Sequence, residues 1–172
     1  MVSTPLNNKR PIPAKFVGLV ILLIIFGILT WLVVAIFFRR WSLVMAPTYY
    51  ATVQINKQLI KAEVATSSAA MYQGLSNRRV LCPACGLLFI FTDSQEREFV
   101  MRNMNWPLDI IFINQNRVIS IAANLPPEGL SPKIIYQSGG LADQVLEVNG
   151  GYTKQQGIKV GDRLSVSAAT LK

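Results

Sequence analysis

The sequence predicts a compact, mainly β (α+β) domain, largely antiparallel and barrel-like with partial closure, preceded by one transmembrane helix. Two observations predict this fold class. The N-terminal part of the 172-residue chain contains a long uncharged stretch, Phe16–Phe38. Residues 51–172 show short β-branched runs at regular spacing, separated by turn residues, a pattern typical of small β domains. Residues 51–172 are enough for one domain and too few for two.

The uncharged stretch has the length of a membrane-spanning helix. Its 23 residues would extend about 35 Å at about 1.5 Å per residue, enough to cross a hydrocarbon core of roughly 30 Å. A cleaved signal peptide would have a shorter apolar core of about 7–15 residues, and Pro47 disfavours cleavage after residues 44–46. We therefore expect Phe16–Phe38 to be an uncleaved anchor.

The charges that flank this stretch predict its orientation. Lys9, Arg10 and Lys15 precede it together with the terminal amine, whereas Arg39 and Arg40 follow it. Because basic flanks stay on the cytoplasmic side, we expect a single-pass protein of the cell membrane with its domain outside the cytoplasm. The expected segments are a cytoplasmic tail (1–15), the transmembrane helix (16–38), a linker (39–50) and the domain (51–172).

Local patterns predict the elements of the domain. Asn56-Lys57 separates two β-branched runs as a hairpin turn would, and Ser67 or Ser68 can cap a short helix. Gly157 is placed to end a second short helix. The expected helices are 67–76 and 152–156. The expected strands are 51–55, 59–65, 87–91, 98–101, 108–113, 117–122, 134–137, 144–148 and 163–167.

Composition excludes several kinds of chemistry. The chain has no histidine, which excludes Ser-His-Asp and Cys-His catalysis and histidine-ligated zinc. Two cysteines cannot supply a four-thiolate zinc site, so no metal or cofactor is expected. The chain carries a net charge of +8, but the charges of residues 51–172 are of mixed sign and interspersed, so no nucleic-acid partner is expected.

An ordered series of motifs along residues 51–168 resembles one known family. The motif residues are Ala65-Thr66, Gly74-Leu75, Arg78, Gly86–Phe91, Phe99–Asn103, Pro107–Ile113, Val145–Glu147, Gly151, Gly157-Ile158 and Gly161-Asp162. On these residues the sequence resembles domain of unknown function 192, a small prokaryotic domain often found in exported or membrane-tethered proteins. The resemblance implies a mainly β fold with short helices and no established activity. The sequence departs from the family pattern at Leu87, Val100 and Met104, where Met, Trp and Thr are usual.

The segment 101–109 is the strongest candidate for a binding site. Arg102, Asn103 and Asp109 place a guanidinium, an amide and a carboxylate among residues of core character, and Glu147 is a further candidate. These groups could bind a small polar ligand. Alternatively they are structural: Asn103 and Asp109 would hold the turn at 105–107, and Arg102 would pair with Asp109 or Glu147.

The motif Cys82-Pro83-Ala84-Cys85 has two interpretations. A structural disulfide bracing a loop outside the cytoplasm is favoured, because no helix is expected after Cys85 to activate a thiol. A catalytic redox pair has the same spacing and stays open.

These observations favour a membrane-tethered accessory domain without catalytic activity, which binds a small polar ligand or a protein partner of the cell envelope. Two alternatives remain. One is a hydrolase or lyase that uses Asp109 and Glu147 as a carboxylate pair. The other is a thiol-disulfide protein that uses Cys82 and Cys85.

Overall fold

The computed structural model describes residues 14–44, 49–167 and 170–171. The chain divides into two units, Met1–Ala46 and Pro47–Lys172, each of which is treated by itself. Most of the expected N-terminal tail and part of the expected linker lie outside the described residues.

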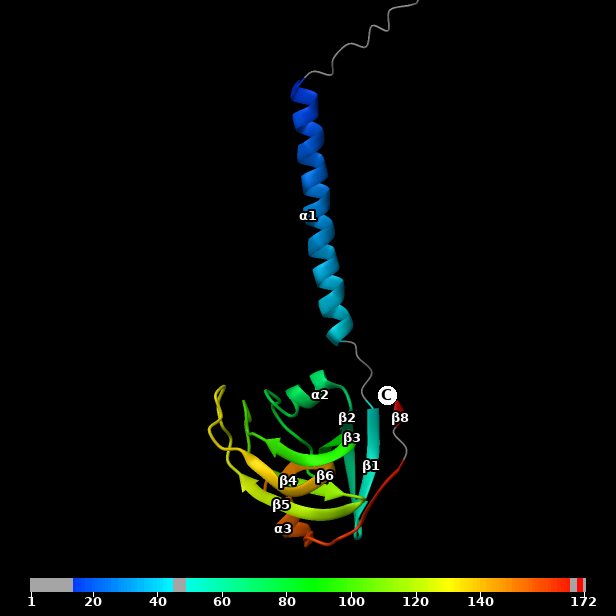
Figure 1. Cartoon of the computed structure of the whole chain (residues 1–172), viewed down its shortest axis with the longest axis vertical. Helices are drawn as coiled ribbons and strands as arrows, with labels where there is room; N and C mark the ends of the chain where they lie inside the picture. The colour runs from blue at the N-terminus through cyan, green and yellow to red at the C-terminus, as the bar shows by residue number, and fades with distance from the viewer. Residues whose placement is uncertain (1–13, 45–48, 168–169, 172) are drawn as a thin grey trace, which may run out of the picture. The chain divides into compact units, whose positions relative to one another are not determined.

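The first unit contains one long helix, α1 (Ala14–Val44), shown in blue in Figure 1. It covers the whole uncharged stretch. Large apolar side chains are exposed in consecutive positions from Ile21 to Phe26, so apolar groups face outward all around the helix. Judged on the described residues, no helix reaches the length and hydropathy that define a membrane span. The transmembrane anchor therefore stays a prediction.

The second unit is a mainly β domain, as predicted. Its strands are β1 (Tyr49–Ile55), β2 (Gln58–Ala65), β3 (Cys85–Phe99), β4 (Leu108–Asn114), β5 (Arg117–Leu125), β6 (Tyr136–Asn149), β7 (Leu164–Val166) and β8 (Thr170–Leu171). Its short helices are α2 (Ser68–Gln73) and α3 (Tyr152–Gln156), both close to the predicted positions. In the sheet the strands follow the order β5-β4-β6-β3-β2-β1-β7, and β8 pairs with β1.

The sheet curls into a half-barrel. Its two end strands approach each other at an isolated antiparallel bridge between Arg117 and Arg163. The backbone N–H of Leu164 also donates to the carbonyl of Asn116 at 3.0 Å. The sheet is mixed, because β2 and β3 pair in parallel while every other strand pair within the described residues is antiparallel. The parallel pair requires the long crossover that carries α2.

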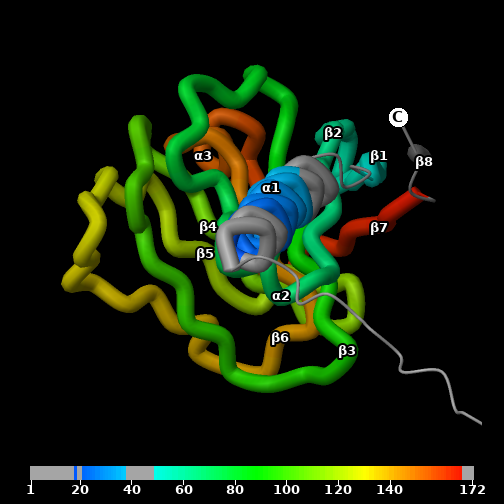
Figure 2. The backbone as a smooth tube through the Cα atoms, turned by 90° about the horizontal axis from the view of Figure 1, so that it is seen from above, coloured from blue at the N-terminus to red at the C-terminus, as the bar shows by residue number. Residues whose placement is uncertain are grey.

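Two expected pairs of short strands are each one long strand. The ranges 87–91 and 98–101 fall largely on β3, and 134–137 and 144–148 fall on β6. The two long strands run side by side with register shifts after Ile90 and after Glu96 (Figure 2). The polar residues around these irregularities interrupt the apolar pattern, which is why the sequence predicted a break.

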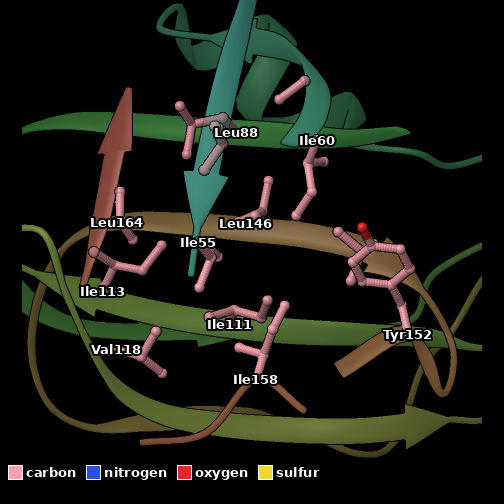
Figure 3. Packing of buried hydrophobic residues seen from close by; sticks show 13 residues of the cluster. Ile55, Ile60, Leu88, Ile111, Ile113, Val118, Leu146, Tyr152, Ile158 and Leu164 are labelled. Carbon is pink, nitrogen blue, oxygen red and sulfur yellow. The ribbon is translucent and has the colours of Figure 1, made fainter. Parts of the chain in front are cut away.

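Side-chain alternation along the central strands builds two hydrophobic cores, one on each face of the sheet. The first core includes Leu88, Ile111 and Leu146 and fills the inside of the half-barrel (Figure 3). The second core includes Phe89 and Phe112 on the opposite face. Because both faces are buried, these strands read as continuous apolar runs in the sequence.

The carboxylate of Asp109 joins three elements at the end of β4. This side chain is fully buried and accepts four hydrogen bonds. Its Oδ1 accepts from the backbone N–H groups of Asn124 and Gly151 at 2.7 and 2.8 Å. Its Oδ2 accepts from the backbone N–H and the hydroxyl of Thr153 at 2.8 and 2.6 Å. Since α3 has no side-chain cap of its own at Gly151, Asp109 satisfies the free N–H groups of its first turn.

We predict that Asp109→Asn lowers the free energy of unfolding by about 3 kcal/mol, because an amide would set its own N–H groups against buried donors. Urea unfolding of the full chain measures the loss. Asp93→Asn is the control, since the Asp93 side chain is 51% exposed in its ion pair with Arg97, and its loss should cost less than about 1 kcal/mol. Equal losses for the two variants would contradict this role of Asp109.

Candidate functional site

A cavity of about 520 Å³ lies on the second-core face of the sheet, beside α2. This size is within the usual range of about 300–1,000 Å³ for small-molecule pockets. Its walls combine aromatic, thioether and charged side chains from α2, β3, β6 and the segments between them. The lining residues are Met71, Tyr72, Leu75, Ser76, Phe89, Phe91, Glu96, Arg97, Glu98, Phe99, Val100, Arg102, Met104, Gln137 and Glu147.

Glu147 is the buried charged group of this pocket. It lies on β6 between Leu87 of β3 and Ile110 of β4, and only 5% of it is exposed. Its Oε2 atom is buried and has no hydrogen-bond partner among the described residues. Burial raises the pKa of Glu147 to about 8, and the positive charge of Arg78 opposes that rise only in part.

Arg78 does not neutralise Glu147, because it is already paired. Its guanidinium donates to both carboxylate oxygens of Glu63, with distances of 2.5 Å from Nη1 to Oε1 and 2.7 Å from Nη2 to Oε2. This hydrogen-bonded pair raises the pKa of Arg78 above its ordinary value. Arg78 therefore contributes only a longer-range field at Glu147.

Two further arginines line the pocket, each lying over an aromatic ring. The Cζ atom of Arg97 is 3.8 Å from the ring centroid of Phe91, and its Nε donates to the carbonyl of Ala142 at 3.1 Å. The Cζ atom of Arg102 is 3.9 Å from the ring centroid of Tyr72, and its Nη2 donates to the carbonyl of that same residue. The rings and carbonyls hold both guanidinium groups in place.

The structure brings together two of the four predicted ligand-binding residues, Arg102 and Glu147. Asn103 does not line the pocket. Its φ of 51° makes a left-handed turn, in which its N–H donates to the carbonyl of Gly129 and its carbonyl accepts from the N–H of Asn77. Arg102 makes no ion pair with Asp109 or Glu147 within the described residues, so the pairing expected under the structural alternative is absent.

Asp109 and Glu147 point to opposite faces of the sheet. Antiparallel pairing places Ile110 opposite Glu147 and Asp109 opposite Val148. Since paired residues share a face and neighbours alternate, Asp109 lies on the first-core face with Val148, whereas Glu147 faces the pocket. The structure therefore does not form the carboxylate pair that a hydrolase or lyase mechanism would need.

Cys82 and Cys85 form a disulfide in the loop that leads into β3. The side-chain amide of Asn149 donates to the carbonyl of Cys82 at 3.0 Å and ties this loop to the end of β6. Cys85 begins a strand and not a helix, so the bond lacks the helix N-terminus that usually activates a redox cysteine. Neither cysteine lines the pocket.

Sequence reasoning missed the arginine–aromatic pairs. Arg97 stands between two glutamates and read as part of a solvated charge pattern. Its ring partner Phe91 is six positions earlier, so only the bend of β3 brings the two together. The sequence held only a weak signal of these pairs, which is that Phe91, Phe99 and Arg102 all fall within motifs of the family pattern.

The fold and the site define a class: a small mainly β domain with a ligand-sized, mixed-charge pocket on a sheet face. The model of DUF192, described as an uncharacterized ACR, matches residues 51–166, and the chain belongs to this family. Two of the three residues that depart from the family pattern, Val100 and Met104, line the pocket, and Leu87 belongs to the second core.

Solved structures of similar proteins include the following two. A protein of unknown function from Novosphingobium aromaticivorans is 32% identical, with a TM-score of 0.62 over 70% of this chain and 92% of that protein. A protein from Sinorhizobium meliloti, described as a proposed transcription regulator, is 29% identical, with a TM-score of 0.62 over 69% of this chain and 93% of its own. No curated protein shows significant similarity to this chain.

We predict that Glu147 makes stability depend on pH. Its pKa of about 8 in the folded state exceeds its ordinary value of 4.5, so its contribution is fully present below about pH 4.5 and is lost as pH rises through 8. Glu147→Gln stays neutral, so it should be more stable than the wild type by roughly 3–5 kcal/mol at pH 9 and within about 1 kcal/mol of it at pH 5.

Urea unfolding of the full chain at the two pH values checks this prediction. Glu98→Gln is the control, because Glu98 lines the same pocket but is exposed, and its replacement should leave the pH profile unchanged. Equal stability of Glu147→Gln and the wild type at pH 9 would show that the Glu147 carboxylate is compensated after all.

Proposed function

We propose that this chain is a membrane-anchored accessory domain that binds a small polar ligand outside the cytoplasm, in the pocket beside α2. The single observation that carries the proposal is the buried Oε2 atom of Glu147, which lacks a partner among the described residues. Buried polar atoms are normally hydrogen-bonded, and an exception that lines a cavity is a candidate ligand contact.

The composition of the pocket supports a small molecule as the ligand. Its volume fits one, and its aromatic and methionine walls would cover an apolar body. Polar and charged side chains share the lining with these walls, and Arg97 and Arg102 are held in fixed positions by their aromatic rings. Such fixed polar groups orient a ligand at a small cost in conformational entropy.

The proposal is binding and not catalysis. Asp109, the other buried carboxylate, lies on the opposite sheet face with four hydrogen bonds, so Glu147 has no second carboxylate of that kind beside it. The exposed Glu96 and Glu98 lie at the pocket wall without the burial that tunes an acid or base.

Membrane anchoring rests on the first unit. Phe16–Phe38 carries no charge and lies within α1, where large apolar side chains are exposed on consecutive positions. A helix that is apolar all round needs an apolar surrounding, and a bilayer provides one. The larger number of basic groups before this stretch supports a domain outside the cytoplasm.

We predict that Val100→Trp removes a ligand that the wild type retains. Val100 lines the pocket and is 37% exposed, so an indole there would fill part of the cavity without disturbing the core. The measurement is small-molecule mass spectrometry of extracts from the full chain purified in detergent, for wild type and variant. Val80→Trp is the matched control, because Val80 is 77% exposed and lies outside the pocket. A molecule retained equally by all three proteins, or by none, would count against the pocket.

We also predict that alkaline phosphatase fused after Lys172 is active, because this enzyme requires the oxidising environment outside the cytoplasm. The same enzyme fused before Met1 should be inactive. Activity in the reverse pattern would place the domain in the cytoplasm, and a fusion protein recovered in the soluble fraction would argue against the anchor.

A further inference from the structure

None of the three arginines that the structure describes at or near the pocket is paired with Glu147. Arg78 donates both of its terminal nitrogens to Glu63. The guanidinium of Arg97 donates to Asp93, and that of Arg102 donates to the carbonyl of Tyr72. No cation within the described residues forms an ion pair with Glu147.

The position of Glu147 determines which ligand group can supply the hydrogen bond that its carboxylate lacks. Solvent reaches only 5% of this residue, and its Oε2 is fully covered. A ligand group that contacts this carboxylate must therefore be small and must donate a hydrogen bond. An ammonium group adds the missing positive charge together with up to three donated hydrogen bonds.

We propose that the pocket binds a small organic ammonium ion with an apolar body, whose N–H groups donate to the Glu147 carboxylate. This inference rests on the proposed function and names the ligand class of the same site. Exclusion of water strengthens a buried ammonium–carboxylate pair, whereas the same pair at the surface contributes little.

The walls above Glu147 suit the rest of such a ligand. Leu75, Phe89, Phe99 and Met104 present apolar surface, and the rings of Phe89 and Phe99 meet edge to face with centroids 4.9 Å apart. Aromatic faces and methionine sulfur are favourable surroundings for an organic cation and its hydrocarbon body.

Binding of this ligand class is linked to loss of a proton. Before binding, Glu147 is mostly protonated at pH 7, and an ammonium ion favours the ionised carboxylate, so the proton leaves to solvent on binding. The other charged groups around it are the Arg78–Glu63 pair and the wall residues Glu96, Arg97, Glu98 and Arg102. The Glu147→Gln variant separates the contribution of Glu147 to the pH dependence from that of these neighbours.

Three probes of matched size test the inference: benzylamine, benzyl alcohol and benzoate, which are cationic, neutral and anionic. The full chain in detergent is titrated with each, and chemical shifts of the pocket residues are followed by NMR. Benzylamine should bind at least tenfold more tightly than the other two at pH 8.5. Its affinity should fall roughly 75-fold from pH 8.5 to pH 6, in proportion to the ionised fraction of Glu147.

The Glu147→Gln variant should lose both the preference for benzylamine and its pH dependence, while Asp143→Asn, outside the pocket lining, should keep both. Equal or tighter binding of benzyl alcohol or benzoate in the pocket would overturn the ammonium inference and leave the proposed binding function standing. Absence of pocket shifts with all three probes would also overturn it. The mass-spectrometry comparison of the wild type with Val100→Trp tests the proposed binding function separately.

Discussion

The pairing of β4 with β6 is the constraint on which the rest of the structure depends. These two central strands carry apolar side chains on both faces, so each face supports its own core. Each strand also buries one carboxyl group, Asp109 on one face and Glu147 on the other. The strand alternation that separates the cores therefore also separates these two groups and their roles.

The two carboxyl groups are both buried, but they differ in the number of hydrogen bonds that they accept. Asp109 receives four donors from β5 and the start of α3, so its charge organises the structure around it. Glu147 receives none within the described residues, and its raised pKa shows that the fold accommodates it by keeping it protonated. A fold selected for stability alone would have an apolar residue at this position.

Local elements of the domain were predictable because their signals are local. The hairpin needs a left-handed residue, and Asn56 has a φ of 56° there. Ser67 caps α2 by accepting from the backbone N–H of Ala70, and Gly157 ends α3 with a φ of 66°. Long-range features were not predictable, because the parallel pairing of β2 with β3 depends on how the chain crosses over between them.

The same distinction applies to the site. Arg102 and Glu147 could be singled out as charged residues within apolar motifs, and both line the pocket. The sequence could not show that Glu147 lacks a partner, because that depends on Arg78 being taken up by Glu63 across fifteen positions. Nor could it show that Asn103 serves a backbone turn, since its left-handed φ and its bonds to Asn77 and Gly129 are tertiary features.

The pocket contains both residues that match the family pattern and residues that depart from it. Glu147 belongs to a motif that this chain has in common with its family pattern, whereas Val100 and Met104 depart from it. Under the ligand hypothesis, Glu147 contacts the ligand at its buried end, whereas Val100 and Met104 belong to the walls that surround the body of the ligand. The valine at position 100 lines the exposed side of this pocket and occupies less space there than a tryptophan would. The difference between this chain and its relatives should then lie in the size of the ligand body, and not in the group that meets Glu147.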